Sequence, residues 1–244
     1  MELERREGYT QQSVQTPIDA AVGTTAYRTL FRNVYLWMTL AMVITAATAY
    51  TVAVTPALLN IVFSNKIFFY VVLFAPLALV WYLSARINKI SFATATSLFI
   101  VYSILIGLTL SVIFLAYTGA SIAMVFGITA GTFGAMALIG TFTKVDLSKL
   151  GGILMMALVG LIIASVVNIF WANDTLYWIV SYAGVLIFVG LTAYDAQKIK
   201  RQLQAHGYEI NDTTQKIALM GALSLYLDFL NMFLFLLRIF GDRR

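Results

Sequence analysis

Residues 216–240, KIALMGALSLYLDFLNMFLFLLRIF, form an apolar run that is interrupted near its centre by one carboxylate, Asp228. A bilayer core about 30 Å thick is crossed by roughly 20 residues of α-helix, so this run is long enough to span it. A charged aspartate at mid-membrane costs at least about 2.5 kcal/mol on insertion scales, and such residues normally face the bundle interior and have a partner. The stretch therefore predicts a transmembrane helix with Asp228 on a buried face.

Six more apolar runs of similar length precede this one. Of the 244 residues, 61% are hydrophobic and only 11% are charged, whereas about 25% of the residues in a soluble domain are charged. The runs are continuously apolar, which favours helices over the alternating strands of a membrane barrel. The predicted fold is an all-α integral membrane protein with seven transmembrane helices, in which a polar N-terminal tail, 1–28, precedes one membrane domain, 29–244. The expected spans are 29–54, 67–85, 91–114, 121–142, 150–171, 176–199 and 216–240.

Basic residues predict the orientation, because cytoplasmic loops are enriched in Lys and Arg. With the N-terminus inside, twelve of the 16 basic residues lie on the cytoplasmic side and four on the other. Three of these four belong to the C-terminal stretch RIFGDRR, 238–244, which runs against the rule. Either the last run crosses fully and leaves these arginines outside, as we expect, or it returns or crosses only partly and leaves them inside.

The fourth span carries small residues that predict a packing surface. They are Gly127, Ala130, Gly131, Gly134 and Ala135. Small side chains let two helix backbones approach closely in lipid, although membrane helices are in general rich in glycine. We expect this surface to pack against another helix, and it carries no implication for chemistry.

Asp195 and Asp228 are the only acidic residues within the predicted spans. At 100° per residue, Gly221, Ser224, Asp228 and Asn231 fall within a sector of about 80°, which predicts a polar seam along the last helix. The sixth and seventh spans are antiparallel neighbours, so the two carboxylates can meet. Their expected depths differ by some 7 Å, so that a pair requires a tilted helix.

Two carboxylates that meet in a poorly hydrated site cannot both ionise cheaply, and they would titrate as one coupled unit. When ionised, the pair would offer oxygen ligands to a hard cation such as Ca²⁺, but far fewer than the 6 to 8 of a tight site. We therefore expect weak, transient metal binding at Asp195 and Asp228, which suits permeation better than storage. The alternative interpretation is that Asp195 is an interfacial carboxylate that is either hydrated or paired with a nearby lysine, and that Asp228 is a satisfied polar group of the core.

Several other functions lack the residues that they need. The chain has no cysteine, and its single histidine, His206, lies in a predicted loop, which excludes a serine–histidine protease and a histidine or thiolate metal site. The only lysine of the last run, Lys216, is its first residue and is therefore not deep enough in the membrane for a retinal Schiff base. Basic residues are spread over short loops, which argues against nucleic acid as a partner. We expect neither an enzyme nor a resident cofactor.

Three motifs resemble the Bax-inhibitor family, also called the transmembrane BAX inhibitor motif family, in its bacterial inner-membrane branch. They are GAMALIGTFTKVDLSKLGG at 134–152, LTAYDAQKIK at 191–200 and SLYLDFLNMFLFLLRIFG at 224–241. The resemblance implies a seven-helix bundle with the last helix central, and a pH-sensitive Ca²⁺ leak near two aspartates that fall on Asp195 and Asp228. It also implies a basic latch after the second span, for which Arg86 and Lys89 are the candidates. The acidic residue that some members have inside the second span is missing here.

Three functions follow as hypotheses. The first is a calcium or cation leak channel of the inner membrane, with Ca²⁺ and protons as partners besides the lipid bilayer. The second is a regulatory membrane protein that binds other membrane proteins, such as a quality-control protease. The third is a secondary transporter that uses the aspartates as a proton relay.

Overall fold

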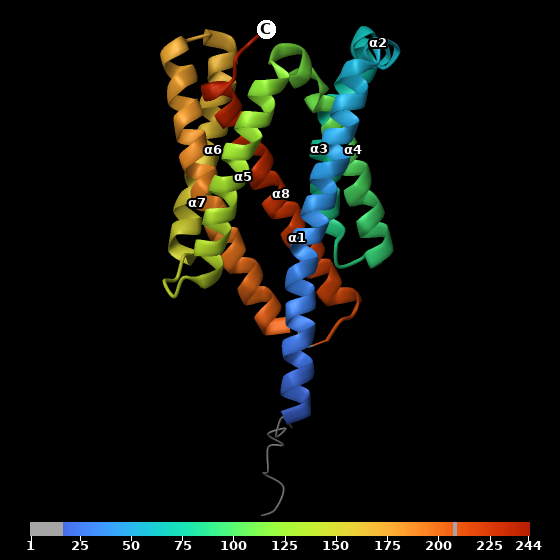
Figure 1. Cartoon of the computed structure of the whole chain (residues 1–244), viewed down its shortest axis with the longest axis vertical. Coiled ribbons are helices and arrows are strands. Elements are labelled where there is room, and N and C mark those ends of the chain that lie inside the picture. Colours follow the sequence, from blue (N-terminus) through green and yellow to red (C-terminus); the bar gives the residue numbers. More distant parts are fainter. Residues whose placement is uncertain (1–16, 207–208) are drawn as a thin grey trace, which may run out of the picture.

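The structure, a computed structural model, describes residues 17–206 and 209–244. In that part of the chain seven helices are long and apolar enough to cross a membrane, which confirms the predicted all-α membrane architecture (Figure 1). Their bounds are α1 Pro17–Val54, α3 Lys66–Arg86, α4 Phe92–Ala116, α5 Gly119–Phe142, α6 Ser148–Trp171, α7 Asp174–His206 and α8 Asp212–Phe240.

The first long helix begins earlier than the apolar run predicts, and a short helix follows it. Residues 17–28, which we assigned to the polar tail, form the first turns of α1, while residues 1–16 lie outside the described residues. The helix stops before Pro56, which has no backbone donor; Thr55 ahead of it is extended, at φ −111° and ψ 101°, as a residue before proline prefers. The short α2, Pro56–Ser64, then leads into α3.

The last apolar run is one continuous helix. α8 begins at a capping box, in which the Asn211 side chain accepts from the Thr214 backbone and the Thr214 side chain accepts from the Asn211 backbone. It continues for 29 residues without a break, so the alternative in which this run turns back to the side where it began is wrong. Full crossing, with the arginines outside, stays a prediction. The C-terminus lies at the end of the bundle opposite to the start of α1 (Figure 1).

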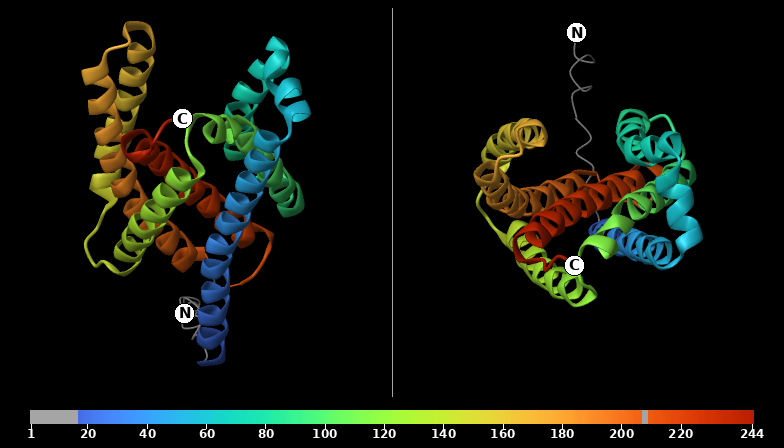
Figure 2. Two further views of the ribbon diagram at one scale, coloured as in Figure 1. Left: turned by 45° about the horizontal axis from the view of Figure 1, so that its top comes forward. Right: turned by 90° about the horizontal axis from the view of Figure 1, so that it is seen from above.

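α8 is the most deeply buried of the long helices. Within its most apolar stretch 67% of the residues are buried, against 44% or less in each of the others. It packs against α7, α1, α5 and α4, and Figure 2 shows it running obliquely between α7 on one side and α1 and α5 on the other. Its apolar side chains away from the predicted seam, such as Leu223 and Phe229, are buried as well. The central position that the resemblance implies stays a prediction.

The small residues of α5 do not pack as predicted. A β-carbon built on Gly127, Gly131 or Gly134 would meet nothing within 4 Å, so this surface faces outward in the single chain. The buried positions of α5 recur every four residues, at Ser121, Val125, Thr129, Phe133 and Ala137. The prediction was wrong because the larger side chains of the opposite face fill the space toward α8, where Phe133 meets Phe229 at 5.5 Å between ring centroids.

The glycines that do allow close approach are elsewhere. Gly140 at the end of α5 lies directly against the backbone of Ala193 in α7. Gly221 of α8 faces the side chain of Ile199 in α7, where an added β-carbon would lie 2.9 Å from Cγ1. These contacts bring α7 close to both α5 and α8, which positions the turn of α7 that carries Asp195.

Candidate functional site

Asp195 and Asp228 come from neighbouring, packed helices, α7 and α8. Asp228 is buried, with 5% of its surface exposed, and Asp195 is half-buried. The charge of Asp228 interacts with those of Asp195 and Lys198, and the charge of Asp195 interacts with that of Lys198. The two predicted residues therefore lie within electrostatic range of each other, and Lys198 lies within range of both.

The register of α7 and α8 sets the offset between the two aspartates along the helix axes. Gly184 of α7 lies against Phe235 of α8, and Ile199 lies against Gly221. Between these contacts α7 and α8 run antiparallel over nearly equal lengths, which puts residue 192 roughly opposite Asp228. Asp195 then lies about 5 Å further along the axis, at 1.5 Å per residue. The oblique course of α8 removes part of the 7 Å mismatch that straight helices predicted (Figure 2).

One oxygen of Asp228 has no partner. Its Oδ2 is buried and accepts no hydrogen bond from any residue that the structure describes. The buried hydroxyl group of Thr192 in α7 differs, because it donates to Phe188 O at 2.7 Å. A buried carboxylate oxygen without a donor is costly, so a proton, a water molecule or a cation at this oxygen would be stabilising.

The predicted polar seam of α8 is partly buried. Ser224 and Asn231 are half-buried, one turn to either side of Asp228. The amide nitrogen of Asn231 donates to Leu227 O at 2.8 Å, which ties that side chain to its own helix. A role of these two residues in an ion path stays a prediction.

Arg86 and Lys89 lie away from this pair. Arg86 ends α3 and Lys89 belongs to the turn that follows, and both side chains are exposed. Neither forms an ion pair within residues 17–206 and 209–244. The cation beside the aspartates is instead Lys198, one helical turn after Asp195, whose Nζ lies 5.9 Å from the centroid of the Tyr194 ring. The sequence signal for it was the i, i+3 spacing, which places both groups on one face of α7.

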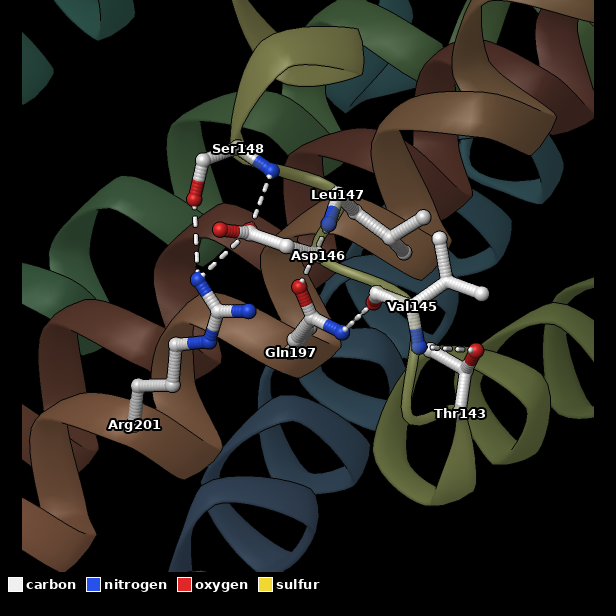
Figure 3. Close-up of polar contacts among 7 residues, drawn as sticks. All are labelled: Thr143, Val145, Asp146, Leu147, Ser148, Gln197 and Arg201. Atoms are coloured by element: carbon white, nitrogen blue, oxygen red, sulfur yellow. Dashed lines mark hydrogen bonds and ion pairs between the residues drawn. The ribbon is translucent and has the colours of Figure 1, made fainter.

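A clasp between α7 and the α5–α6 loop was not predicted from the sequence (Figure 3). The Gln197 side chain accepts from Leu147 N at 2.8 Å and donates to Val145 O at 2.7 Å. Arg201 Nη1 pairs with Asp146 Oδ1 at 2.8 Å and donates to Ser148 Oγ at 2.8 Å. Loop contacts of this kind leave no periodic signal in a sequence.

The same loop shapes the electrostatics of Asp146. A hydrogen bond from the Ser148 backbone, together with the Ser148 side chain and Arg201, lowers the pKa of Asp146 to about 2. One residue before Arg201, Lys200 Nζ donates to Thr141 O at 2.7 Å, in the last turn of α5. A lysine at that place satisfies a free carbonyl and complements the helix dipole. The clasp and this cap together hold the part of α7 that follows Asp195.

No group of three or more acidic, histidine or cysteine side chains in the described residues could hold a metal ion. Two carboxylates fit weak cation binding and not a tight calcium site, which uses 6 to 8 oxygens.

Comparison with known proteins supplies a family. The family model described as "Inhibitor of apoptosis-promoting Bax1" matches residues 27–244. The inner membrane protein YbhL of Escherichia coli K12 is 49% identical over 217 residues, which cover 89% of this chain and 93% of YbhL. An uncharacterized protein of Borreliella burgdorferi is 44% identical, covering 87% of this chain and 91% of its own length. Protein RP147 of Rickettsia prowazekii is 40% identical, covering 87% and 89%.

Proposed function

Because the chain belongs to the Bax-inhibitor family and is a multi-pass inner-membrane protein, we propose that it is a pH-sensitive cation leak channel gated by Asp195 and Asp228. Calcium is the ion that the family resemblance implies. The N-terminus is proposed to be cytoplasmic, supported by the twelve basic residues on that side. A single cysteine placed at Lys144 should then react with an impermeant maleimide only from the cytoplasm.

The observation that carries the proposal is the Oδ2 of Asp228, which is buried near a second carboxylate and has no hydrogen-bond partner among the described residues. A purely structural aspartate would have its oxygens satisfied by backbone or hydroxyl donors. Repulsion between two carboxylates in a medium of low dielectric is relieved either by a shared proton or by a cation. Protons and cations would therefore compete for the same oxygens, which makes flux sensitive to pH.

In this proposal Lys198 is the internal counter-ion of the two aspartates when the channel is closed. It interacts with both aspartates while its own side chain is exposed at the end of the site. An exposed lysine on a flexible stem can leave the pair without a change in the helix backbone. Lys198 thus takes the position that the resemblance led us to expect for Arg86 or Lys89.

The test is Ca²⁺ flux into dye-loaded liposomes that contain the purified chain, across about pH 5 to 8. We expect flux that varies several-fold with pH, and loss of that variation in Asp195→Asn and in Asp228→Asn. Asp174→Asn is the matched control, because this exposed aspartate at the start of α7 lies far along the helix from Asp195. Flux no greater than in empty liposomes, or an unchanged pH profile in both site variants, would refute the proposal.

The regulatory role remains the competing hypothesis. It assigns importance to the N-terminal tail and loops instead of to the aspartates. Removing residues 1–16 leaves α1 intact from Pro17. Ion flux should survive this deletion if the chain is a leak channel, whereas recovery of bound membrane proteins from native membranes should fall if it is a regulator. A proton-coupled transporter would instead show saturable uptake of a solute driven by a pH gradient.

A further inference from the structure

The arginines of the C-terminal stretch have no part in the proposed leak. Arg238 lies in the last turn of α8, and Arg243 and Arg244 follow it at the end of the bundle opposite to the start of α1 (Figure 1). All three side chains are exposed. The distribution of basic residues predicted few cations at this end, so their presence calls for a physical reason.

The tail that carries them is held in place by the backbone of the α4–α5 connection. Thr118 N donates to Asp242 O at 3.1 Å, and Arg244 N donates to Ala116 O at 3.0 Å. Asp242 N donates to Ser121 Oγ at 2.9 Å. Three hydrogen bonds over three residues give the tail a defined position, so its side chains are presented from a rigid support.

Two guanidinium groups share one aromatic ring. Arg238 lies 5.9 Å and Arg243 lies 6.0 Å from the centroid of Tyr177 in α7. Arg243 Nη2 also donates to Tyr177 Oη at 2.9 Å, and Arg238 lies 5.2 Å from the ring centroid of Phe235. Arg243 also forms a hydrogen bond with the Tyr117 side chain. These contacts orient both planar groups, and the two tyrosines take up two of the five N–H donors of Arg243.

Within residues 17–206 and 209–244, no carboxylate forms an ion pair with either guanidinium group. The acidic residues at this end, Asp174 and Asp242, form no ion pair with them in the described part of the chain. The two ion pairs found there, Arg201–Asp146 and Lys216–Asp212, lie at the other end of the bundle. Two like charges beside one ring repel each other, and an anion between them would relieve that repulsion.

The surrounding side chains place this end at the level of lipid headgroups. Exposed aromatic residues gather at the ends of α6, α7 and α8, and tryptophan and tyrosine are enriched at the membrane–water interface. They are Phe170, Trp171, Trp178 and Phe240. The nearest abundant anion at that depth is the phosphate of a phospholipid. A planar guanidinium group binds phosphate well, because it can donate two parallel hydrogen bonds to it.

We propose that Arg238 and Arg243, held against Tyr177, bind the phosphate of an anionic phospholipid in the leaflet at the C-terminal end of the bundle. This site is independent of the aspartates. It accounts for arginines on the side where the loop charges predict few, because a bound lipid neutralises them. It also anchors the end of α8, whose middle carries Asp228.

The test measures lipid retention by native mass spectrometry of the full chain, with added phosphatidylglycerol, phosphatidylcholine or inorganic phosphate. We expect phosphatidylglycerol to be retained most strongly, and its apparent affinity to fall about tenfold in the double variant Arg238→Gln, Arg243→Gln, as expected for loss of one charge-assisted contact pair. The double variant Arg28→Gln, Arg32→Gln removes two exposed arginines near the start of α1 and should change that affinity by less than about twofold.

A third variant separates the effect of the two positive charges from that of the guanidinium geometry. It also shows whether a loss of affinity in the glutamine variant comes from misfolding. Arg238→Lys with Arg243→Lys keeps both charges but loses the planar forks, so it should fold and retain phosphatidylglycerol at an intermediate affinity. Equal retention by the natural chain and by the glutamine variant would overturn the proposal. So would retention of phosphatidylcholine equal to that of phosphatidylglycerol, or displacement of the lipid by inorganic phosphate at equal concentration, since the site would then not be specific for an anionic lipid.

Discussion

Gln197 lies two residues after Asp195 in α7, and its side-chain amide donates to the carbonyl oxygen of Val145 at 2.7 Å. The oxygen of the same amide accepts a hydrogen bond from the backbone N–H of Leu147, two residues further along the loop. Two backbone groups of the α5–α6 loop are therefore bonded to α7. Because Gln197 is only 5% exposed, water cannot readily replace either bond. The clasp thus fixes the turn of α7 that presents Asp195 to Asp228.

Gln197→Ala should lower the free energy of unfolding by about 1 to 3 kcal/mol, since two hydrogen bonds are lost and two backbone groups lose their partner. The measurement is thermal unfolding of the purified chain in detergent. Gln202→Ala is the control, because Gln202 lies on the same helix and is exposed; its effect should stay within about 0.5 kcal/mol. Equal losses in the two variants would show that the clasp contributes nothing to stability.

Gly140→Ala should destabilise the protein by about 1 to 3 kcal/mol, because the added methyl group meets the backbone of Ala193, which cannot move away as a side chain end can. Gly131→Ala makes the same chemical change in the same helix where nothing lies within 4 Å, and should be neutral or slightly stabilising. Size-exclusion chromatography of heated samples compares the thermal stability of the two variants with that of the natural chain. A loss of similar size at Gly131 would mean that its surface is covered by another chain in the membrane.

Asp146→Asn should leave the pH profile of ion flux unchanged between about pH 5 and 8. The pKa of Asp146 is lowered from its ordinary 3.8 to about 2 in the folded chain. The stabilisation of the folded chain by the ionised Asp146 side chain is therefore complete above about pH 4 and is lost as the pH falls toward 2. The difference in melting temperature between the natural chain and this variant should accordingly shrink between pH 4 and pH 2. A flux profile shifted at pH 6 would assign part of the pH response to the clasp instead of the aspartate pair.

Part of this architecture is local and could be predicted from the sequence. Each of the seven spans is set by one property of one segment, the length of its apolar run relative to the bilayer, so their number and approximate bounds agree with the structure. Burial of Asp228 followed in the same way, because a carboxylate inside a membrane helix is too costly to face lipid. The short α2 was missed because it is apolar like its neighbours, although Pro56 marks its start.

Relations between segments could not be predicted in this way. Apolar runs and single carboxylates within them are properties of one segment, so the seven spans and the two aspartates inside them could be predicted from the sequence. The oblique course of α8, the partner of Asp195, the outward direction of the α5 glycines and the Gln197 clasp depend on how helices pack against each other. Spacing along one helix defines its faces but not which neighbour each face meets, since crossing angle and register follow from the summed fit of many side chains.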